Sequence, residues 1–170
     1  MIKNMDMYVL GIDPGLDGAI ALLDLDGELH DVIDMPLHTT GKRANGNPKR
    51  QVDDAKVRDI LFNWMNDDIL LGAIERVQSA PGGGATSMFT FGEGFGLVKG
   101  VMRGLNIPYE QITPAKWKTH YQLGRDKGTS LDVARQMWPH FSDSFKFKKN
   151  DGRAEAALIG LYAATEFYQS

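Results

Sequence analysis

The chain contains 170 residues, of which 42% are hydrophobic and 24% charged, with a formal net charge of -3. This length favours one domain over residues 1–170 with one hydrophobic core, and the absence of cysteine excludes disulfide bonds and thiolate zinc sites. No signal peptide pattern is present, and no apolar run approaches the roughly 18 residues that a membrane span needs. We therefore expect a cytoplasmic protein that does not enter a membrane.

Charged residues are distributed unevenly along the chain. Residues 1–38 contain eight acidic side chains and a single lysine, Lys3. The basic residues then gather in three runs: Lys42, Arg43, Lys49 and Arg50; Lys116, Lys118, Arg125 and Lys127; and Lys146, Lys148 and Lys149. Such runs are usually solvated surface, but around an acidic region they also fit a phosphate-binding face that surrounds a metal site.

The N-terminal region predicts three short strands, at residues 8–13, 19–24 and 28–35. Turns at residues 14–18 and at Asp26-Gly27 would join them into an antiparallel meander. The first strand ends on Asp13. Because a buried carboxylate without a partner is costly, Asp13 needs a proton, a base or a metal.

The next elements lead to a second carboxylate. Residues 38–50 are polar and rich in glycine and asparagine, which predicts a mobile loop. Asp53 can cap a helix that extends to about residue 66, since apolar residues then repeat at helical spacing. Residues 69–77 predict a central strand that is apolar on both faces until Glu75 interrupts it.

A long helix is predicted from about residue 86 to 105, after a glycine-rich loop. Glycines occur every four residues in it and therefore line one face: Gly92, Gly96, Gly100 and Gly104. Each glycine destabilises a helix by about 0.5–1 kcal/mol relative to alanine. We therefore expect a close neighbour on this face, either the sheet or another helix of the same chain, or a second subunit.

The C-terminal part predicts a fifth strand at residues 107–112 and a helix capped by Thr113. Another helical pattern at residues 131–138 is stopped by a proline, and a last helix covers about residues 151–167. Asp151 and Glu155 lie four residues apart and so share a face of that helix. They could be an ordinary N-cap and a first-turn acid, but the small apolar residues around Glu155 favour close packing on the sheet.

Four carboxylates thus need an explanation: Asp13, Glu75, Asp151 and Glu155. Clustered carboxylates repel one another and therefore share protons or bind cations. An all-oxygen set suits magnesium or manganese rather than zinc. Two such ions about 3.5–4 Å apart can hold a phosphodiester between them, one activating water and the other stabilising the leaving 3′ oxygen. This pattern predicts phosphodiester hydrolysis.

Five motifs resemble, in order and separation, those of RuvC-type Holliday junction resolvases: "LGIDPGLDGA", "AIERV", "GEGFGLVKGVMRG", "ITPAKWK" and "DGRAEAALIG". The resemblance covers nearly the whole chain. It implies an α/β ribonuclease H-like fold, with a five-stranded mixed sheet of a three-strand antiparallel meander plus two parallel strands, flanked by helices. It also implies a homodimer that nicks four-way DNA junctions symmetrically, using two Mg²⁺ ions per active site, with Mn²⁺ able to substitute, and no nucleotide cofactor.

By this resemblance Asp13, Glu75, Asp151 and Glu155 are the catalytic metal ligands. The bacterial members usually place their last two acids three residues apart, whereas here the interval is four and the second acid is Glu155. Helix geometry tolerates either spacing. The form "DGRAEA" looks like the viral branch of the family, which predicts a virus or phage origin and a location in the host cytoplasm.

Candidate DNA-binding residues come from the basic runs. Lys116 and Lys118 lie in a segment where the family contacts DNA phosphates. Lys148 and Lys149 directly precede the last helix, and either pair could neutralise the phosphate in the transition state. The first basic run adds Arg43, Lys49 and Arg50. For all of these residues, simple solvent exposure is the alternative.

Aromatic and turn residues carry further expectations. Phe89 follows the glycine-rich loop and could stack on a base or pack in the core. Asp17 is expected to form a turn rather than to bind metal. The tryptophans, Trp64, Trp117 and Trp138, are expected in the core.

Three other functions compete. Sugar kinases and actin-like ATPases also begin with an apolar strand followed by Asp and Gly, but they need two such domains, more than this length is expected to supply. A related nuclease acting on flaps, forks or branched DNA with little junction specificity would use the same metal chemistry. A non-cleaving homologue is disfavoured because it has little reason to keep four mutually repelling acids.

Overall fold

The computed structural model describes residues 6–65, 68–76, 84–124 and 128–168. Within them, five strands form one mixed sheet in the order β3-β2-β1-β6-β7. Their bounds are β1 Met7–Asp13, β2 Ala19–Asp24, β3 Leu29–Asp34, β6 Ile69–Glu75 and β7 Tyr109–Ile112. The strands β1, β2 and β3 pair antiparallel, whereas β6 is parallel to β1 and β7 is parallel to β6. The expected meander with two parallel strands is confirmed.

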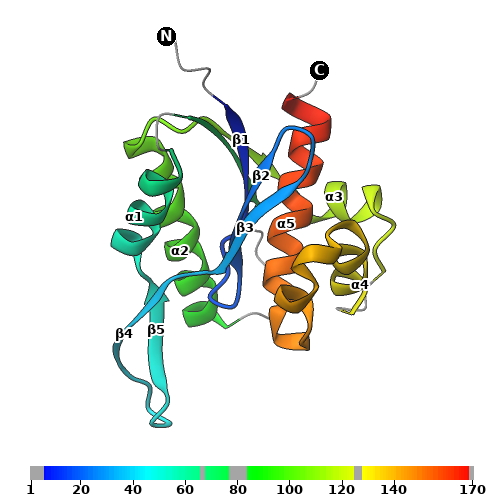
Figure 1. Cartoon of the computed structure of the whole chain (residues 1–170). Coiled ribbons are helices and arrows are strands. Elements are labelled where there is room, and N and C mark those ends of the chain that lie inside the picture. Colours follow the sequence, from blue (N-terminus) through cyan, green and yellow to red (C-terminus); the bar gives the residue numbers. More distant parts are fainter. Residues whose placement is uncertain (1–5, 66–67, 77–83, 125–127, 169–170) are drawn as a thin grey trace.

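Helices cover both faces of this sheet (Figure 1). On one face lie α1 (Asp54–Met65) and α2 (Ala85–Gly104). The other face carries α3 (Pro114–His120), α4 (Gly128–Met137) and α5 (Asp151–Ala163). Asp53 caps α1 as expected, because its Oδ1 accepts a hydrogen bond from the Lys56 amide at 3.0 Å.

Short helical turns surround α5. The 3-10 turns η1 (Pro139–Phe145) and η2 (Lys148–Asn150) connect α4 to α5, and a π-helical turn, η3 (Ala164–Tyr168), follows α5. The α-helix itself therefore ends earlier than the expected residue 167. Asn150 stands at the N-cap position and Asp151 is the first helical residue, so Asp151 does not serve as the N-cap.

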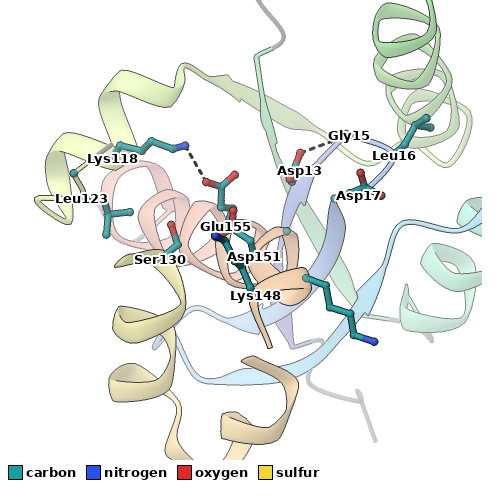
Figure 2. A pocket seen from close by; sticks show the side chains of 14 residues that line it. Asp13, Gly15, Leu16, Asp17, Lys118, Leu123, Ser130, Lys148, Asp151 and Glu155 are labelled. Carbon is teal, nitrogen blue, oxygen red and sulfur yellow. Dashed lines mark hydrogen bonds and ion pairs between the residues drawn. The ribbon is translucent and has the colours of Figure 1, made fainter. Parts of the chain in front are cut away.

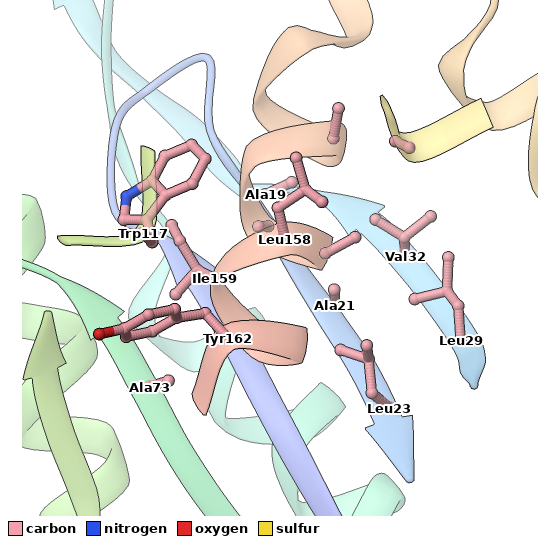
Figure 3. Close-up of a cluster of buried hydrophobic side chains, with 14 of the residues drawn as sticks. Ala19, Ala21, Leu23, Leu29, Val32, Ala73, Trp117, Leu158, Ile159 and Tyr162 are labelled. Carbon is pink, nitrogen blue, oxygen red and sulfur yellow. The ribbon is translucent and has the colours of Figure 1, made fainter. Parts of the chain in front are cut away.

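Two apolar clusters fill the space between the sheet and its helices. Beneath α5, side chains of β2 and β3 meet Leu158, Ile159 and Tyr162 (Figure 3). On the opposite face, Leu10 and Ile12 of β1 pack with residues of α1 and α2. Burial of β1 on both faces explains why its sequence is almost continuously apolar.

Glycines allow α5 to lie directly on β1. A Cβ atom at Gly11 would overlap the backbone of Ala156 and Gly160, and a Cβ atom at Gly152 would overlap the backbone of Asp17. The main chains of the helix and the strand are therefore in contact, with no side chain between them. This contact places the N-terminal turn of α5 beside the C-terminal end of β1.

The segment predicted as a mobile loop is a β-hairpin. Strands β4 (Leu37–Lys42) and β5 (Pro48–Val52) pair antiparallel and form a sheet separate from the central one. The turn between them is closed by a hydrogen bond from the Arg43 amide to the Asn47 carbonyl at 2.8 Å, and Gly46 supplies a positive φ of 83°. Most of the hairpin is exposed on both faces, so its sequence lacks the alternation that identifies a half-buried strand.

No helix in the described ranges combines the length and apolarity required to cross a bilayer.

Candidate active site

A cleft of about 1160 Å³ opens where β1 ends and α5 begins (Figure 2). Its lining combines acidic and basic side chains from β1, the β1–β2 turn, α3, η2 and α5. The charged residues that line it are Asp13, Asp17, Lys118, Lys148, Lys149, Asp151 and Glu155.

Asp13 lies at the C-terminal end of β1 and is partly buried. One carboxylate oxygen, Oδ1, accepts a hydrogen bond from the Gly15 amide at 3.0 Å. Burial, followed by the negative charges of Glu75 and Glu155, raises the pKa of Asp13 to about 7. The Gly15 hydrogen bond and the charge of Lys118 oppose this rise without cancelling it. The positive charge near Asp13 is therefore too weak to offset its burial and the two neighbouring acids.

Glu75 approaches Asp13 from the neighbouring strand. It is the last residue of β6, which is parallel to β1 with Ile74 opposite Ile12. The indole Nε1–H of Trp117 donates a hydrogen bond to Glu75 Oε1 at 3.0 Å. Burial and the charge of Glu155 raise the pKa of Glu75, whereas the Trp117 hydrogen bond lowers it.

Glu155 is paired with Lys118. The distance between Lys118 Nζ and Glu155 Oε1 is 2.9 Å, and the Glu155 side chain is only 16% exposed. Burial alone would lower the pKa of Lys118, but the hydrogen bond and charge of Glu155, then the charges of Glu75 and Asp151, raise it. Lys118 is therefore the counter-charge of the whole acidic group.

Asp151 lines the same cleft one helical turn before Glu155. The structure thus places three of the four predicted carboxylates around one cleft, from β1 and α5, and the fourth at the end of the neighbouring strand β6. Asp13, Asp151 and Glu155 line the cleft, while Glu75 lies next to Asp13 and is held by Trp117.

The four carboxylates supply the oxygen ligands that a hard divalent cation prefers. All four groups are carboxylates, and the raised pKa of Asp13 results partly from repulsion that a cation would relieve. In the part of the chain that the structure describes, however, no three acidic or histidine side chains converge into a metal-binding group. Glu155 faces the Lys118 ammonium instead, so a metal would require these side chains to rotate toward each other.

The predicted DNA-binding lysines separate into two groups. Lys118, Lys148 and Lys149 line the cleft. Lys116 is exposed on α3 and is not among the residues that line the cleft. Residues two apart in a helix point to different faces, so only Lys118 of this pair faces the cleft.

The four aromatic residues considered in the sequence differ in burial. Phe89 on α2 is 73% exposed, so core packing is wrong for this residue. Trp117 and Trp138 are buried as expected, and Trp64 is half-buried against the α1 and α2 cluster. No sequence pattern predicts the contact between Trp117 and Glu75. The only indication is that a buried indole N–H generally needs a hydrogen-bond acceptor.

Asp17 has a contact that the sequence did not predict. It lies in the β1–β2 turn, as expected of a turn former, and lines the cleft. Its Oδ1 also accepts a hydrogen bond from Arg50 Nη1 at 2.9 Å. Arg50 belongs to β5, so this pair connects the hairpin to the turn beside the candidate active site.

Ser130 on α4 also lines the cleft, although nothing in the sequence indicated it, and it is only 3% exposed.

The glycine face of α2 contacts nothing within the described chain. A Cβ atom at any of the four periodic glycines would meet no atom within 4 Å: Gly92, Gly96, Gly100 and Gly104. Tight packing within the chain is therefore wrong for this face. Gly94, outside the periodic series, makes the close contact, with Val52 at the base of the hairpin.

Comparison with known proteins identifies similar chains, although no family model matches this one. The chloroplastic Holliday junction resolvase MOC1 of Chlamydomonas reinhardtii is 31% identical over 96 residues, which are 55% of this chain and 11% of that protein. The chain thus spans about a ninth of the length of this curated relative.

Solved structures are similar over nearly the whole chain. The RuvC of T. thermophilus in complex with a Holliday junction substrate superposes with a TM-score of 0.61 at 16% identity, covering 93% of this chain and 92% of that one. A second structure of Thermus thermophilus RuvC gives a TM-score of 0.51 at 17% identity, covering 95% and 98%. The fold is therefore RuvC-like, which confirms the expected ribonuclease H-like architecture.

Proposed function

Starting from this RuvC-like fold, we propose that the protein is a structure-selective endodeoxyribonuclease that resolves four-way DNA junctions. The observation that carries the proposal is a cleft lined by three carboxylates, Asp13, Asp151 and Glu155, together with lysines, while Glu75 on β6 is close enough to raise the pKa of Asp13. The relative MOC1, a Holliday junction resolvase, and RuvC, solved with a junction substrate, support the choice of DNA substrate.

In this proposal Asp13, Glu75, Asp151 and Glu155 hold two Mg²⁺ ions, with Mn²⁺ able to replace them. When bound, the ions supply an activated water and stabilise the leaving 3′ oxygen of the phosphodiester. Lys118 gives up its contact with Glu155 and donates to a phosphate oxygen, where its charge opposes the negative charge that develops during cleavage.

The DNA backbone is held by cations at the rim of the cleft. Lys148 and Lys149 line the cleft from η2. Lys116 on α3 lies outside the cleft lining and would bind DNA beyond it. Phe89 is exposed on α2, in a position to stack on a base where the junction opens. Phosphate contacts of this kind provide affinity without sequence preference.

We further propose a homodimer in which two active sites nick opposing strands symmetrically. Its support is the glycine face of α2, which would let the backbone of a second subunit approach closely. Each of these glycines destabilises an exposed helix by about 0.5–1 kcal/mol relative to alanine, and a partner helix gives a reason for them. The origin in a virus or phage and the location in a host cytoplasm stay predictions.

The test presents a four-way junction, a fork, a flap and plain duplex of equal length to the protein with Mg²⁺, and maps the cuts. We expect paired nicks at symmetric positions of the junction and little cutting of duplex. Faster cutting of flaps or forks than of junctions would favour the alternative, a branched-DNA nuclease with little junction specificity. Equal cutting of duplex and junction would contradict the proposal.

A further inference from the structure

The hairpin formed by β4 and β5 projects away from the central sheet (Figure 1). Residues 37–52 contain four lysines and arginines and no acidic residue. The side chains of Lys42, Arg43 and Lys49 are exposed, and that of Arg50 is half-buried. A projecting element with one sign of charge attracts a polyanion over distances comparable to the Debye length.

A second cleft, of about 560 Å³, lies between this hairpin and the N-terminal end of α2. We call it the hairpin cleft. Arg43, Lys49 and Arg50 line it from the hairpin side. Thr86, Ser87 and Thr90 line it from α2, across from the three basic residues. The Thr90 hydroxyl donates to the Thr86 carbonyl at 3.0 Å and Arg50 pairs with Asp17, so we expect Arg43, Lys49 and the hydroxyls of Thr86 and Ser87 to contact a ligand.

These groups match the chemistry of a sugar–phosphate backbone. Arginine, lysine and the hydroxyls of serine and threonine are among the side chains that contact phosphate oxygens in protein–DNA complexes. Arginine can also bind a phosphate through two parallel hydrogen bonds. The lining contains no carboxylate, so nothing in it repels an anion.

The hairpin cleft is fixed to the body of the protein at its base. Val52, which ends β5, is 1% exposed, and a Cβ atom at Gly94 would lie 3.0 Å from Val52 Cγ2. The Arg50–Asp17 pair, at 2.9 Å, joins the middle of β5 to the β1–β2 turn. The base of the hairpin is therefore packed against the body of the protein, beside the turn that lines the candidate active site.

The two clefts are also adjacent. Leu16 of the β1–β2 turn lines both of them, and Asp17, which lines the first cleft, bonds Arg50, which lines the second. We call the first cleft, where β1 ends and α5 begins, the acidic cleft. A DNA strand that leaves the acidic cleft past this turn would enter the hairpin cleft next.

We infer that the hairpin cleft binds the backbone phosphates of the DNA arm next to the cleaved phosphodiester. This inference rests on the proposed function for the identity of the nucleic acid, and it adds a binding site that the acidic cleft does not contain. The hairpin then provides a second phosphate-binding site on the same DNA strand, a short distance from the cleaved bond.

The test measures binding without cleavage. Fluorescence anisotropy of a labelled four-way junction is recorded in EDTA over a range of salt concentrations for the wild type and for the double variant Arg43→Gln/Lys49→Gln. Each lost phosphate contact should reduce the slope of log K against log salt by about 0.9. We expect a reduction of about 1.8 for each bound subunit of the double variant, and a smaller loss of affinity in Ser87→Ala.

The matched control is Arg58→Gln, which removes a positive charge from α1. Arg58 lies outside both cleft linings and pairs with its neighbour Asp59, so its slope should equal that of the wild type. Because these side chains are exposed, all variants should unfold at the wild-type temperature.

The outcomes separate this inference from the proposed function. A double variant with the wild-type salt slope would overturn the hairpin cleft as a phosphate site, even if the wild type cuts junctions. An equal loss of slope in Arg58→Gln would also overturn it, because the effect would then be one of net charge. If the double variant loses slope but the wild type cuts no branched DNA, the phosphate site stands and the proposed nuclease function fails.

Discussion

The acidic cleft and the hairpin cleft lie on either side of the same turn and are built in opposite ways. The acidic cleft takes its carboxylates from the ends of two central strands and from α5, whose backbone is packed on β1. The hairpin cleft takes its cations from an exposed two-stranded element outside the central sheet. The carboxylates, which need fixed positions relative to one another, are thus held by the core. The basic side chains, which need only to carry charge close to the DNA, are held by the projecting hairpin. Substitutions in the two clefts should therefore affect cleavage and binding separately.

The largest expected effect is that of Asp13→Asn. Because Asp13 lies in the cleft under the influence of Glu75 and Glu155, its neutralisation should reduce the cleavage rate by more than about a hundredfold, the scale for losing one group that stabilises a transition state. Junction affinity in EDTA should change little, since phosphate contacts elsewhere provide it. Single-turnover cleavage and anisotropy measure the two quantities. A variant that cuts normally would show that the carboxylates are not the catalytic set.

The acidic cleft should also make stability depend on pH. The pKa of Asp13 is about 7 in the folded protein against an ordinary value of 3.8, so between these values the folded state holds a proton that the unfolded chain has released. The free energy of unfolding should therefore fall as the pH rises from about 4 to 7. In EDTA, the melting temperature should be lower at pH 8 than at pH 5.5.

Two comparisons sharpen that experiment. Asp13→Asn should remove most of the difference between the two pH values and melt above the wild type at pH 8. Addition of Mg²⁺ or Mn²⁺ should raise the wild-type melting temperature more at pH 8 than at pH 5.5, because ligands bind metal when deprotonated. A melting temperature that changes neither with added metal nor with pH would contradict the proposed cation site.

A moderate effect is expected from Trp117→Phe. Loss of the indole hydrogen bond to Glu75 should raise the pKa of Glu75 further and shift the acid limb of the pH–rate profile for cleavage to higher pH. We expect roughly a 10-fold lower rate or metal affinity, as for other groups that orient a ligand. Trp138→Phe is the control, because Trp138 is also buried but donates to the Gly27 carbonyl at 2.9 Å. An equal shift in both variants would mean that packing alone is responsible.

The smallest effect concerns α2, whose N-terminal end lines the hairpin cleft and whose glycine face lies open. Gly96→Ala should fit without any clash within the chain and stabilise the helix by about 0.5–1 kcal/mol. Gly96→Leu should weaken self-association, measured by analytical ultracentrifugation, because its side chain would separate two closely packed subunits. An unchanged dimer in Gly96→Leu would exclude this face as the interface.

The sequence predicts the acidic cleft better than its surroundings. Asp13 and Glu75 interrupt or end apolar runs, and Asp151 and Glu155 share one face of a helix, so local patterns identify all four. The contacts that hold them are not local. Glu75 and Trp117 are 42 residues apart, and Asp17 and Arg50 are 33 apart; neither pair produces a periodic signal.

The hairpin and the glycine face show two further limits of the sequence. A hairpin exposed on both faces has no apolar alternation, so residues 38–50 resemble a loop until their pairing is seen. The periodicity of Gly92, Gly96, Gly100 and Gly104 correctly defines a face, but not what lies against it. Composition cannot distinguish a contact within the chain from a contact with a partner.

The contact between α5 and β1 sets the spacing of the acids by main chain alone. Because Gly11 and Gly160 leave no side chain between α5 and β1, and Gly152 lies directly on the β1–β2 turn, the position of Glu155 relative to Asp13 depends on three small residues and on the helical repeat. Substitutions of the same volume in the two apolar clusters should leave this spacing unchanged. A chain of this design can lose most of its sequence identity and still present the same four carboxylates.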